Sequence, residues 1–299
     1  MRKFRATAAF AALLLALAGC SSANPLRGSG GGGGDSSTIV IGSQDSYSSE
    51  IIAEVYAQAL EREGYEVRRD FRIGQREVYM PEIESGSIDV FPEYTGSLLQ
   101  YYDKDSQETD PDKVYEQLES KLPDGLVVLS PSDATDQDTY VVTRQFAEEH
   151  SVTSIGDLAG IDGLVLGGNT ELETRPYGPK GLKSEYDVDV RFTPVEGSGS
   201  STSINALKNG QIQIANIYSA NPDLASDDLV ALEDPKALLP SARVVPLVSS
   251  RLPVGAAKVL DRVSASMSAD ELVEMNRKSQ ENGSPASTIA SQWLDENDF

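Results

Sequence analysis

The sequence predicts an α/β fold, because short β-branched segments alternate with amphipathic ones along most of its 299 residues. Residues 38–42 (TIVIG) are typical of a strand. A helix capped by Ser48 or Ser49 follows, with apolar residues at helical spacing up to Gly64. A strand at 67–73, a helix at 76–84 and a strand at 88–91 repeat the pattern. This β-α-β-α-β series favours a parallel sheet with helices on its faces.

The same alternation continues to the end of the chain, which is helical. The remaining predicted strands are 126–129, 140–143, 164–167, 213–218 and 244–248. The remaining predicted helices are 110–121, 202–208, 254–263, 268–277 with Ser268 as its cap, and 284–294.

The N-terminal segment has the features of an export signal. Arg2, Lys3 and Arg5 precede an apolar run that is too short to cross a bilayer. Leu17-Ala18-Gly19-Cys20 resembles the lipobox of bacterial lipoproteins, which implies removal of a signal peptide at 1–19 and lipidation of Cys20. An ordinary secretory signal with a chance cysteine is the alternative. Residues 20–37 are rich in Gly and Ser, and we expect them to form a flexible tether to the body that begins near Thr38.

The composition restricts the partners and the chemistry. Loss of Arg2, Lys3 and Arg5 with the signal leaves 22 basic against 47 acidic residues, a net charge near −25. Nucleic acid and anionic lipid surfaces would repel such a chain, although the acidity is equally typical of solubility or a saline habitat. With one cysteine and one histidine, His150 in a polar stretch, we expect no disulfide, no metal site and no cofactor.

Five motifs resemble those of the substrate-binding proteins of osmoprotectant ABC importers, which capture glycine betaine, choline, carnitine and related quaternary amines. These motifs are Ile41-Gly42-Ser43, residues 56–61 (YAQALE), residues 86–97 (GSIDVFPEYTGS), residues 175–178 (RPYG) and residues 206–210 (ALKNG). The similarity runs from about Thr38 to the C-terminus, and Pro-Glu-Tyr-Thr-Gly with its preceding Gly-x-Ile-Asp is its most specific part.

The resemblance implies a periplasmic-binding-protein-like fold of type II, in which two α/β lobes are joined by two crossover strands and the ligand lies in the interlobe cleft. We expect residues 38–137 and 249–299 to form lobe I and residues 138–248 to form lobe II. The first crossing is expected near 132–138 and the return after Val248. The implied partners are a small-molecule ligand and an ABC permease with cytoplasmic ATPases. The protein would be a monomer, anchored by lipid on the extracytoplasmic face of a bacterial cell membrane.

Tyrosines are the first candidates for ligand contact, because a quaternary ammonium has no hydrogen-bond donor and is held by aromatic faces. Tyr94, Tyr140 and Tyr218 lie at predicted strand ends or in the expected crossover, where open α/β sheets bind ligands. The resemblance independently implies cage tyrosines at these three positions.

Three polar residues are candidates as well. Ser97, expected at the start of a helix, has a hydroxyl that donates to a carboxylate, or it serves as a helix cap. Arg175 resembles the arginine that meets a ligand carboxylate in the family, and an ordinary salt bridge is the alternative. Asp138 resembles an acidic residue at the cage wall, or it is a turn residue.

Two departures from the family pattern bear on the choice of ligand. Gln44 stands where many relatives have a lysine, and residues 200–203 (SSTS) lack the tyrosine that betaine-binding relatives carry nearby. Tyr47 or Tyr177 would have to fill the open side of the cage. A larger or uncharged ligand, such as an amphipathic aromatic compound, is therefore an alternative to betaine.

Two other classes of protein are also considered. A surface-anchored hydrolase would use paired carboxylates, Asp89 with Glu93 or Glu171 with Glu173. The sequence has only a loose approach to a Gly-x-Ser-x-Gly nucleophile motif, in residues 197–201, so we expect no enzyme. A structural or adhesive lipoprotein would bind no small molecule.

Overall fold

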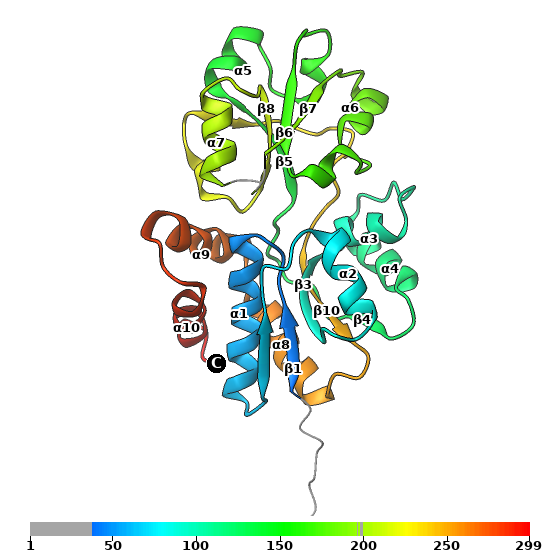
Figure 1. Cartoon of the computed structure of the whole chain (residues 1–299), viewed down its shortest axis with the longest axis vertical. Helices are drawn as coiled ribbons and strands as arrows, with labels where there is room; N and C mark the ends of the chain where they lie inside the picture. Colours follow the sequence, from blue (N-terminus) through cyan, green and yellow to red (C-terminus); the bar gives the residue numbers. More distant parts are fainter. Residues whose placement is uncertain (1–37, 196, 198–199) are drawn as a thin grey trace, which may run out of the picture. The chain divides into compact units, whose positions relative to one another are not determined.

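The described part of the chain has two lobes, each built on a five-stranded sheet (Figure 1). The computed structural model describes residues 38–195, 197 and 200–299. The predicted signal peptide, the tether and the lipidated Cys20 lie outside the described residues. No helix of the described part is long and apolar enough to cross a membrane.

The first sheet has the strand order β2-β1-β3-β10-β4. Its strands are β1 (Ile39–Gly42), β2 (Val67–Asp70), β3 (Val90–Tyr94), β4 (Leu126–Val128) and β10 (Val244–Ser249). β1 runs parallel to β2 and β3, as the β-α-β-α-β series predicts. β10 runs antiparallel to both β3 and β4, so the complete sheet is mixed, and the prediction of parallel pairing is confirmed for the first three strands.

The second sheet has the order β7-β6-β8-β5-β9 and follows the same scheme. Its strands are β5 (Asp138–Thr143), β6 (Val165–Gly168), β7 (Arg191–Pro194), β8 (Ile214–Tyr218) and β9 (Leu229–Ala231). β6 is parallel to β7 and β8, whereas β5 is antiparallel to β8 and β9. The chain enters β5 and β10 from the other lobe, and each of these strands runs antiparallel to both of its neighbours. Neither strand is joined to its own sheet by a preceding crossover helix, which is the connection that makes strands parallel.

Two crossovers join the lobes, as expected from the resemblance. The chain passes from β4 to β5 and returns between β9 and β10. The return therefore comes before Val244. The expected boundary after Val248 is wrong, since Val248 pairs with Val90 and Val127 of the first sheet. The crossovers contact each other: Thr135 and Arg243 form an antiparallel bridge, and the Val244 N–H donates to the Ala134 carbonyl at 2.9 Å.

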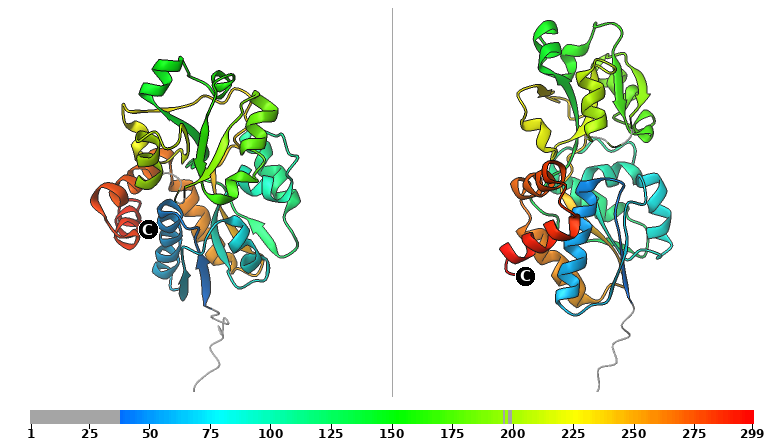
Figure 2. Two further views of the ribbon diagram at one scale, coloured as in Figure 1. Left: turned by 45° about the horizontal axis from the view of Figure 1, so that its top comes forward. Right: turned by 60° about the vertical axis from the view of Figure 1, so that its left-hand side comes forward.

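Helices cover both faces of the first sheet (Figure 2). They are α1 (Tyr47–Arg62), α2 (Arg76–Glu84), α3 (Thr95–Tyr102), α4 (Pro111–Lys121), α8 (Val254–Ser266), α9 (Ala269–Asn282) and α10 (Ala286–Glu296). One core joins α1 to the three C-terminal helices, and a second core joins α2, α3 and α4 to the other face. The C-terminal helices therefore complete the first lobe, as expected.

One of the two predicted helix caps is confirmed, and the other lies at a different serine. Ser268 caps α9 and forms a capping box with Glu271, as predicted. α1 begins at Tyr47 rather than after Ser48 or Ser49, because the hydroxyl of Ser46 accepts the Ser49 N–H at 3.2 Å.

The second lobe carries three short α-helices, α5 (Arg144–His150), α6 (Pro179–Tyr186) and α7 (Ser201–Lys208), and the 3-10 turns η1 (Ile155–Leu158), η2 (Thr170–Glu173) and η3 (Pro222–Ala225). Only α7 is predicted by the sequence. α5 has only seven residues, and α6 (PKGLKSEY) has too few apolar residues for a helical period to stand out, whereas the equally short α7 carries Ile204, Ala206 and Leu207. His150 is exposed at the end of α5, in keeping with the expected surface position.

Candidate functional site

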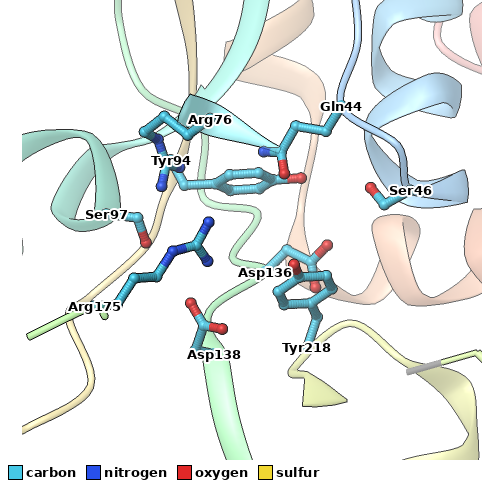
Figure 3. A pocket seen from close by; sticks show the side chains of 9 residues that line it. All are labelled: Gln44, Ser46, Arg76, Tyr94, Ser97, Asp136, Asp138, Arg175 and Tyr218. Carbon is cyan, nitrogen blue, oxygen red and sulfur yellow. The ribbon is translucent and has the colours of Figure 1, made fainter. Parts of the chain in front are cut away.

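A cleft between the lobes holds most of the predicted ligand-binding residues (Figure 3). Its empty volume is about 320 Å³, including open solvent. Nine residues line it: Gln44, Ser46, Arg76, Tyr94, Ser97, Asp136, Asp138, Arg175 and Tyr218. Six of these nine belong to the predicted set of eight. The first lobe, the first crossover and the second lobe all contribute.

Strand ends position the central side chains. Tyr94 is the last residue of β3 and Tyr218 is the last residue of β8. Asp138 begins β5 and stands opposite Tyr218 in the antiparallel ladder, so both side chains lie on the same face of the second sheet. Gln44 follows β1 by two residues. Local strand geometry therefore brings residues far apart in the sequence to one place.

One end of the cleft is acidic. Asp136 and Asp138 are both buried, and neither forms an ion pair with any described residue. Asp136 Oδ1 accepts the Ala220 N–H at 3.0 Å, whereas Asp138 Oδ1 has no hydrogen-bond partner in the described part. Burial, together with the nearby charge of Asp138, raises the pKa of Asp136 to about 6, although hydrogen bonds from Ser48 and Ala220 oppose this shift.

Two tyrosine rings accompany these carboxylates. The Tyr94 ring extends into the middle of the site, and the Tyr218 ring lies beside Asp136 (Figure 3). Burial raises the pKa of the Tyr94 hydroxyl well above its usual value, so the ring stays neutral at physiological pH. The Tyr218 hydroxyl accepts a hydrogen bond from Asn169 at 3.4 Å. Neutral rings next to buried carboxylates form a surface that attracts cations.

The other side of the cleft, next to Asp138, carries positive charge (Figure 3). The guanidinium of Arg175 reaches from the second lobe to the first, where Nη2 lies 3.4 Å from both Gln75 Oε1 and Glu77 Oε2. Nη1 donates to the Tyr177 hydroxyl at 3.3 Å. These distances are long for charge-assisted hydrogen bonds, so the guanidinium is held loosely although its side chain is only 11% exposed. Ser97 lies beside it in Figure 3.

Arg76 is held much more tightly than Arg175. Its Nε and Nη2 each donate to one oxygen of Glu93 at 2.8 Å, which is bidentate geometry. Glu93 is fully buried and also accepts the Tyr79 hydroxyl at 2.6 Å and the Tyr94 N–H at 2.8 Å. This cluster fixes the backbone that carries Tyr94, and it leaves Glu93 no role as an acid or base.

Gly96 lets the second crossover approach the start of α3. A Cβ at this position would lie 2.2 Å from the Ser241 carbonyl oxygen, which accepts the Gly96 N–H at 2.9 Å. The Thr95 N–H donates to the Arg243 carbonyl at 3.0 Å. The first two N–H groups of α3 are therefore used by the second crossover, and the Ser97 side chain lines the cleft.

Two predicted residues do not line the cleft. Tyr140 is fully buried in the core of the second lobe, and its hydroxyl donates to the Tyr177 carbonyl. It shares a strand face with Asp138, but two residues along β5 carry it ~7 Å from the strand end. Tyr47 packs against the core of the first lobe and contacts Gln280 of α9 through its hydroxyl. The cage position of Tyr140 is therefore wrong in this structure, and Tyr47 does not close the open side.

Three lining residues, Ser46, Arg76 and Asp136, are missing from the sequence-based set. Asp136 could have been predicted from the sequence. It lies two residues before Asp138, and alternate residues of an extended crossover point to the same side. Arg76 has none, because its partner Glu93 is 17 residues away. Gln44, which replaces the expected lysine, is buried, and its Nε2 has no hydrogen-bond partner in the described part.

Two α/β lobes joined by two crossovers, with a charged and aromatic cleft between them, define a solute-binding receptor. A family model described as the substrate binding domain of an ABC-type glycine betaine transport system matches residues 37–296. The chain belongs to this family of substrate-binding domains, whose members are receptors for solutes outside the cytoplasm, as the resemblance implies.

Individual relatives are distant but cover nearly the whole chain. The glycine betaine-binding protein YehZ of Escherichia coli K12 is 24% identical over 275 residues, which is 86% of this chain and 90% of YehZ. A crystal structure of a glycine betaine/carnitine/choline ABC transporter protein matches with a TM-score of 0.69 at 19% identity, covering 87% and 98% of the two chains. Lactococcal OpuAC, closed around glycine betaine, matches with a TM-score of 0.65 at 16% identity, covering 87% and 96%. These structures share the fold.

Proposed function

We propose that this receptor captures a zwitterionic quaternary ammonium compound and delivers it to an ABC permease driven by cytoplasmic ATPases. One observation carries the proposal: two buried carboxylates without ion-pair partners in the described part, Asp136 and Asp138, lie beside the rings of Tyr94 and Tyr218. The relatives named for glycine betaine support the same class of ligand.

The acidic end calls for a cation. Burying an ionised carboxylate without a partner costs several kcal/mol. A ligand cation offsets this cost, so the unliganded cleft is destabilised in a way that binding relieves. A quaternary ammonium cannot donate hydrogen bonds, and the faces of Tyr94 and Tyr218 supply ~0.5–2 kcal/mol each in its place.

The other end of the cleft suits an anion on the same ligand. Arg175 provides a loosely held guanidinium and Ser97 a hydroxyl. The loss of the expected lysine at position 44 removes one charge, which leaves Arg175 as the main cationic contact. A zwitterion therefore matches both ends, whereas choline would use only the acidic end.

Binding would draw the lobes together. Tyr94 and Ser97 come from the first lobe, while Asp138, Arg175 and Tyr218 come from the second. A ligand that contacts both sets favours the closed form, which is the form expected to dock on the permease. We propose that the receptor is a monomer without catalytic activity, held on the extracytoplasmic face of the membrane by lipid on Cys20.

The alternatives have less support. A neutral aromatic ligand would bring no positive charge to Asp136, which forms no ion pair with a described residue. A hydrolase would need paired carboxylates, but Glu93 is bound by Arg76, and Asp89, directly before β3, accepts the Val40 N–H of β1 at 2.9 Å. Glu171 and Glu173 lie in η2 and are not among the residues that line the cleft.

Replacing Tyr94 by alanine tests the aromatic contact. We expect Tyr94→Ala to weaken the binding of glycine betaine about 5- to 30-fold, corresponding to ~1–2 kcal/mol for a ring facing a cation. Tyr94→Phe keeps the ring and should bind within twofold of the wild type. Tyr140→Phe is the matched control, because that ring lies in the core. Titration calorimetry measures all three, and equal affinity in Tyr94→Ala and wild type would rule out the cage role.

Affinity should also depend on pH. The raised pKa of Asp136, about 6, means that its carboxylate is mostly ionised at pH 7.5 and mostly protonated at pH 5. A bound cation favours the ionised form, so the dissociation constant should be flat above pH 7 and rise up to about tenfold per pH unit below pH 6. Calorimetry from pH 5 to 8 checks this, and a flat profile across the range would contradict it.

A further inference from the structure

A second chamber opens from the cationic end of the cleft. Its empty volume is about 900 Å³, including open solvent. Arg76, Ser97 and Arg175 line both spaces, so the chamber continues the cleft beyond the proposed anion contacts. Glycine betaine, whose carboxylate ends the molecule at Arg175, would leave the chamber unused.

The far wall of the chamber comes from α3 and the residues after it. Ser97, Gln100 and Tyr101 line it from one face of α3, at the spacing i, i+3 and i+4, and Lys104 lines it from the turn that follows the end of this helix at Tyr102. Gln100 Oε1 is buried and has no hydrogen-bond partner in the described part. Lys104 forms no ion pair with a described residue. The chamber thus offers an acceptor, a cation and an aromatic ring.

The order of these groups along the cleft constrains the ligand. Along the cleft, the aspartates and tyrosines of the acidic end are followed by Arg175 and Ser97, and then by the second chamber with Gln100. A carboxylate ends a carbon chain, whereas a phosphodiester carries its single negative charge within the chain and continues on the other side. Gln100 Oε1 is a buried acceptor, and leaving it without a hydrogen bond costs free energy. The part of the ligand beyond the phosphate should therefore carry a hydrogen-bond donor, such as a hydroxyl.

We propose that the receptor takes choline phosphodiesters with a hydroxylated tail. The trimethylammonium lies at Asp136 and Tyr218, the phosphate at Arg175 and Ser97, and the tail donates to Gln100 Oε1. This inference rests on the proposed function and narrows its ligand class. Lys104 lines the chamber that would hold the tail. Because the tail is neutral, the phosphate of the ligand is attracted by Arg175 on one side and by Lys104 on the other.

Calorimetric titration of the protein with sn-glycero-3-phosphocholine, phosphocholine and glycine betaine tests the proposal. Glycerophosphocholine should bind at least tenfold more tightly than the other two. Gln100→Leu, which removes the acceptor but keeps the volume, should weaken glycerophosphocholine about 3- to 10-fold and leave glycine betaine within twofold. Gln292→Leu on exposed α10 is the matched control and should change neither. Unchanged glycine betaine affinity also shows that the variants are folded.

The possible failures are distinguishable. Binding of glycine betaine with no gain from the glycerol tail would overturn this inference and leave the proposed function standing. Binding of no quaternary amine would overturn both. Phenylalanine betaine provides a further comparison, since its side chain branches beside the carboxylate. If it binds more tightly than glycerophosphocholine, the chamber accommodates a branched carboxylate and the phosphodiester class is wrong.

Discussion

Asp136→Asn is expected to weaken the binding of a quaternary amine about 30-fold and to stabilise the unliganded protein. Two unit charges 4 Å apart attract by ~4 kcal/mol at an effective dielectric constant of 20, and desolvation of the ammonium offsets about half of this. The amide oxygen of asparagine can still accept the Ala220 N–H, so the crossover keeps its geometry. Calorimetry with glycine betaine measures the loss of affinity.

The gain in stability has a definite pH dependence. The pKa of Asp136 is raised in the folded protein, so its contribution to stability is fullest below the unfolded pKa near 4 and is lost as the pH rises through about 6. Asp136→Asn should therefore raise the melting temperature by about 4 °C at pH 7 and by almost nothing at pH 4. The exposed neighbour Asp133→Asn is the control. A variant that is less stable at pH 7, or that binds as well as wild type, would contradict this account.

The largest loss of stability is expected for Arg76→Met. This change leaves Glu93 fully buried without its bidentate partner, and breaking a buried ion pair in this way costs ~3–5 kcal/mol. Arg72→Met is the matched control, because Arg72 is half exposed and pairs with Glu50 at the surface, which contributes less than ~1 kcal/mol. Urea unfolding followed by circular dichroism compares the two free energies.

A second substitution separates the charge effect from the loss of packing. Glu93→Gln in the Arg76→Met background removes the unpaired charge, so the double variant should regain part of the lost stability. If the double variant is as unstable as Arg76→Met, the cost comes from volume and hydrogen bonding rather than from the buried carboxylate. Because the pair holds the backbone of Tyr94, we also expect Arg76→Met to lower the affinity for glycine betaine.

Much of the fold follows from local patterns in the sequence. The period of apolar residues identifies β1, α1, β2, α2 and β3, and the helix between each consecutive pair of strands makes the three strands parallel. The direction of β10 depends on the fact that the chain enters this strand from the other lobe. No local sequence pattern indicates this. For the same reason the second boundary is misplaced, since 244–248 looks like any buried strand.

The sequence predicts those cleft residues that stand at the ends of strands. It misses those that are placed by contacts with residues far away in the sequence. Tyr94, Asp138 and Tyr218 stand at strand ends, and ends of strands meet at the cleft. Tyr140 looks equally suitable in the sequence, but its place two residues inside β5 puts it in the core. Arg76 is found only in three dimensions, through its contact with Glu93.

The most direct test of a cation-binding cleft compares choline with its neutral carbon isostere, 3,3-dimethyl-1-butanol. The two ligands have nearly the same shape, so they differ in little but the charge that faces Asp136, Asp138 and the two tyrosines. Titration calorimetry should show choline binding at least 30-fold more tightly, with a much smaller difference in Asp136→Asn, in which Asp138 and the two rings remain. Equal affinity for the two ligands, or no binding of choline and glycine betaine at millimolar concentration, would contradict the account.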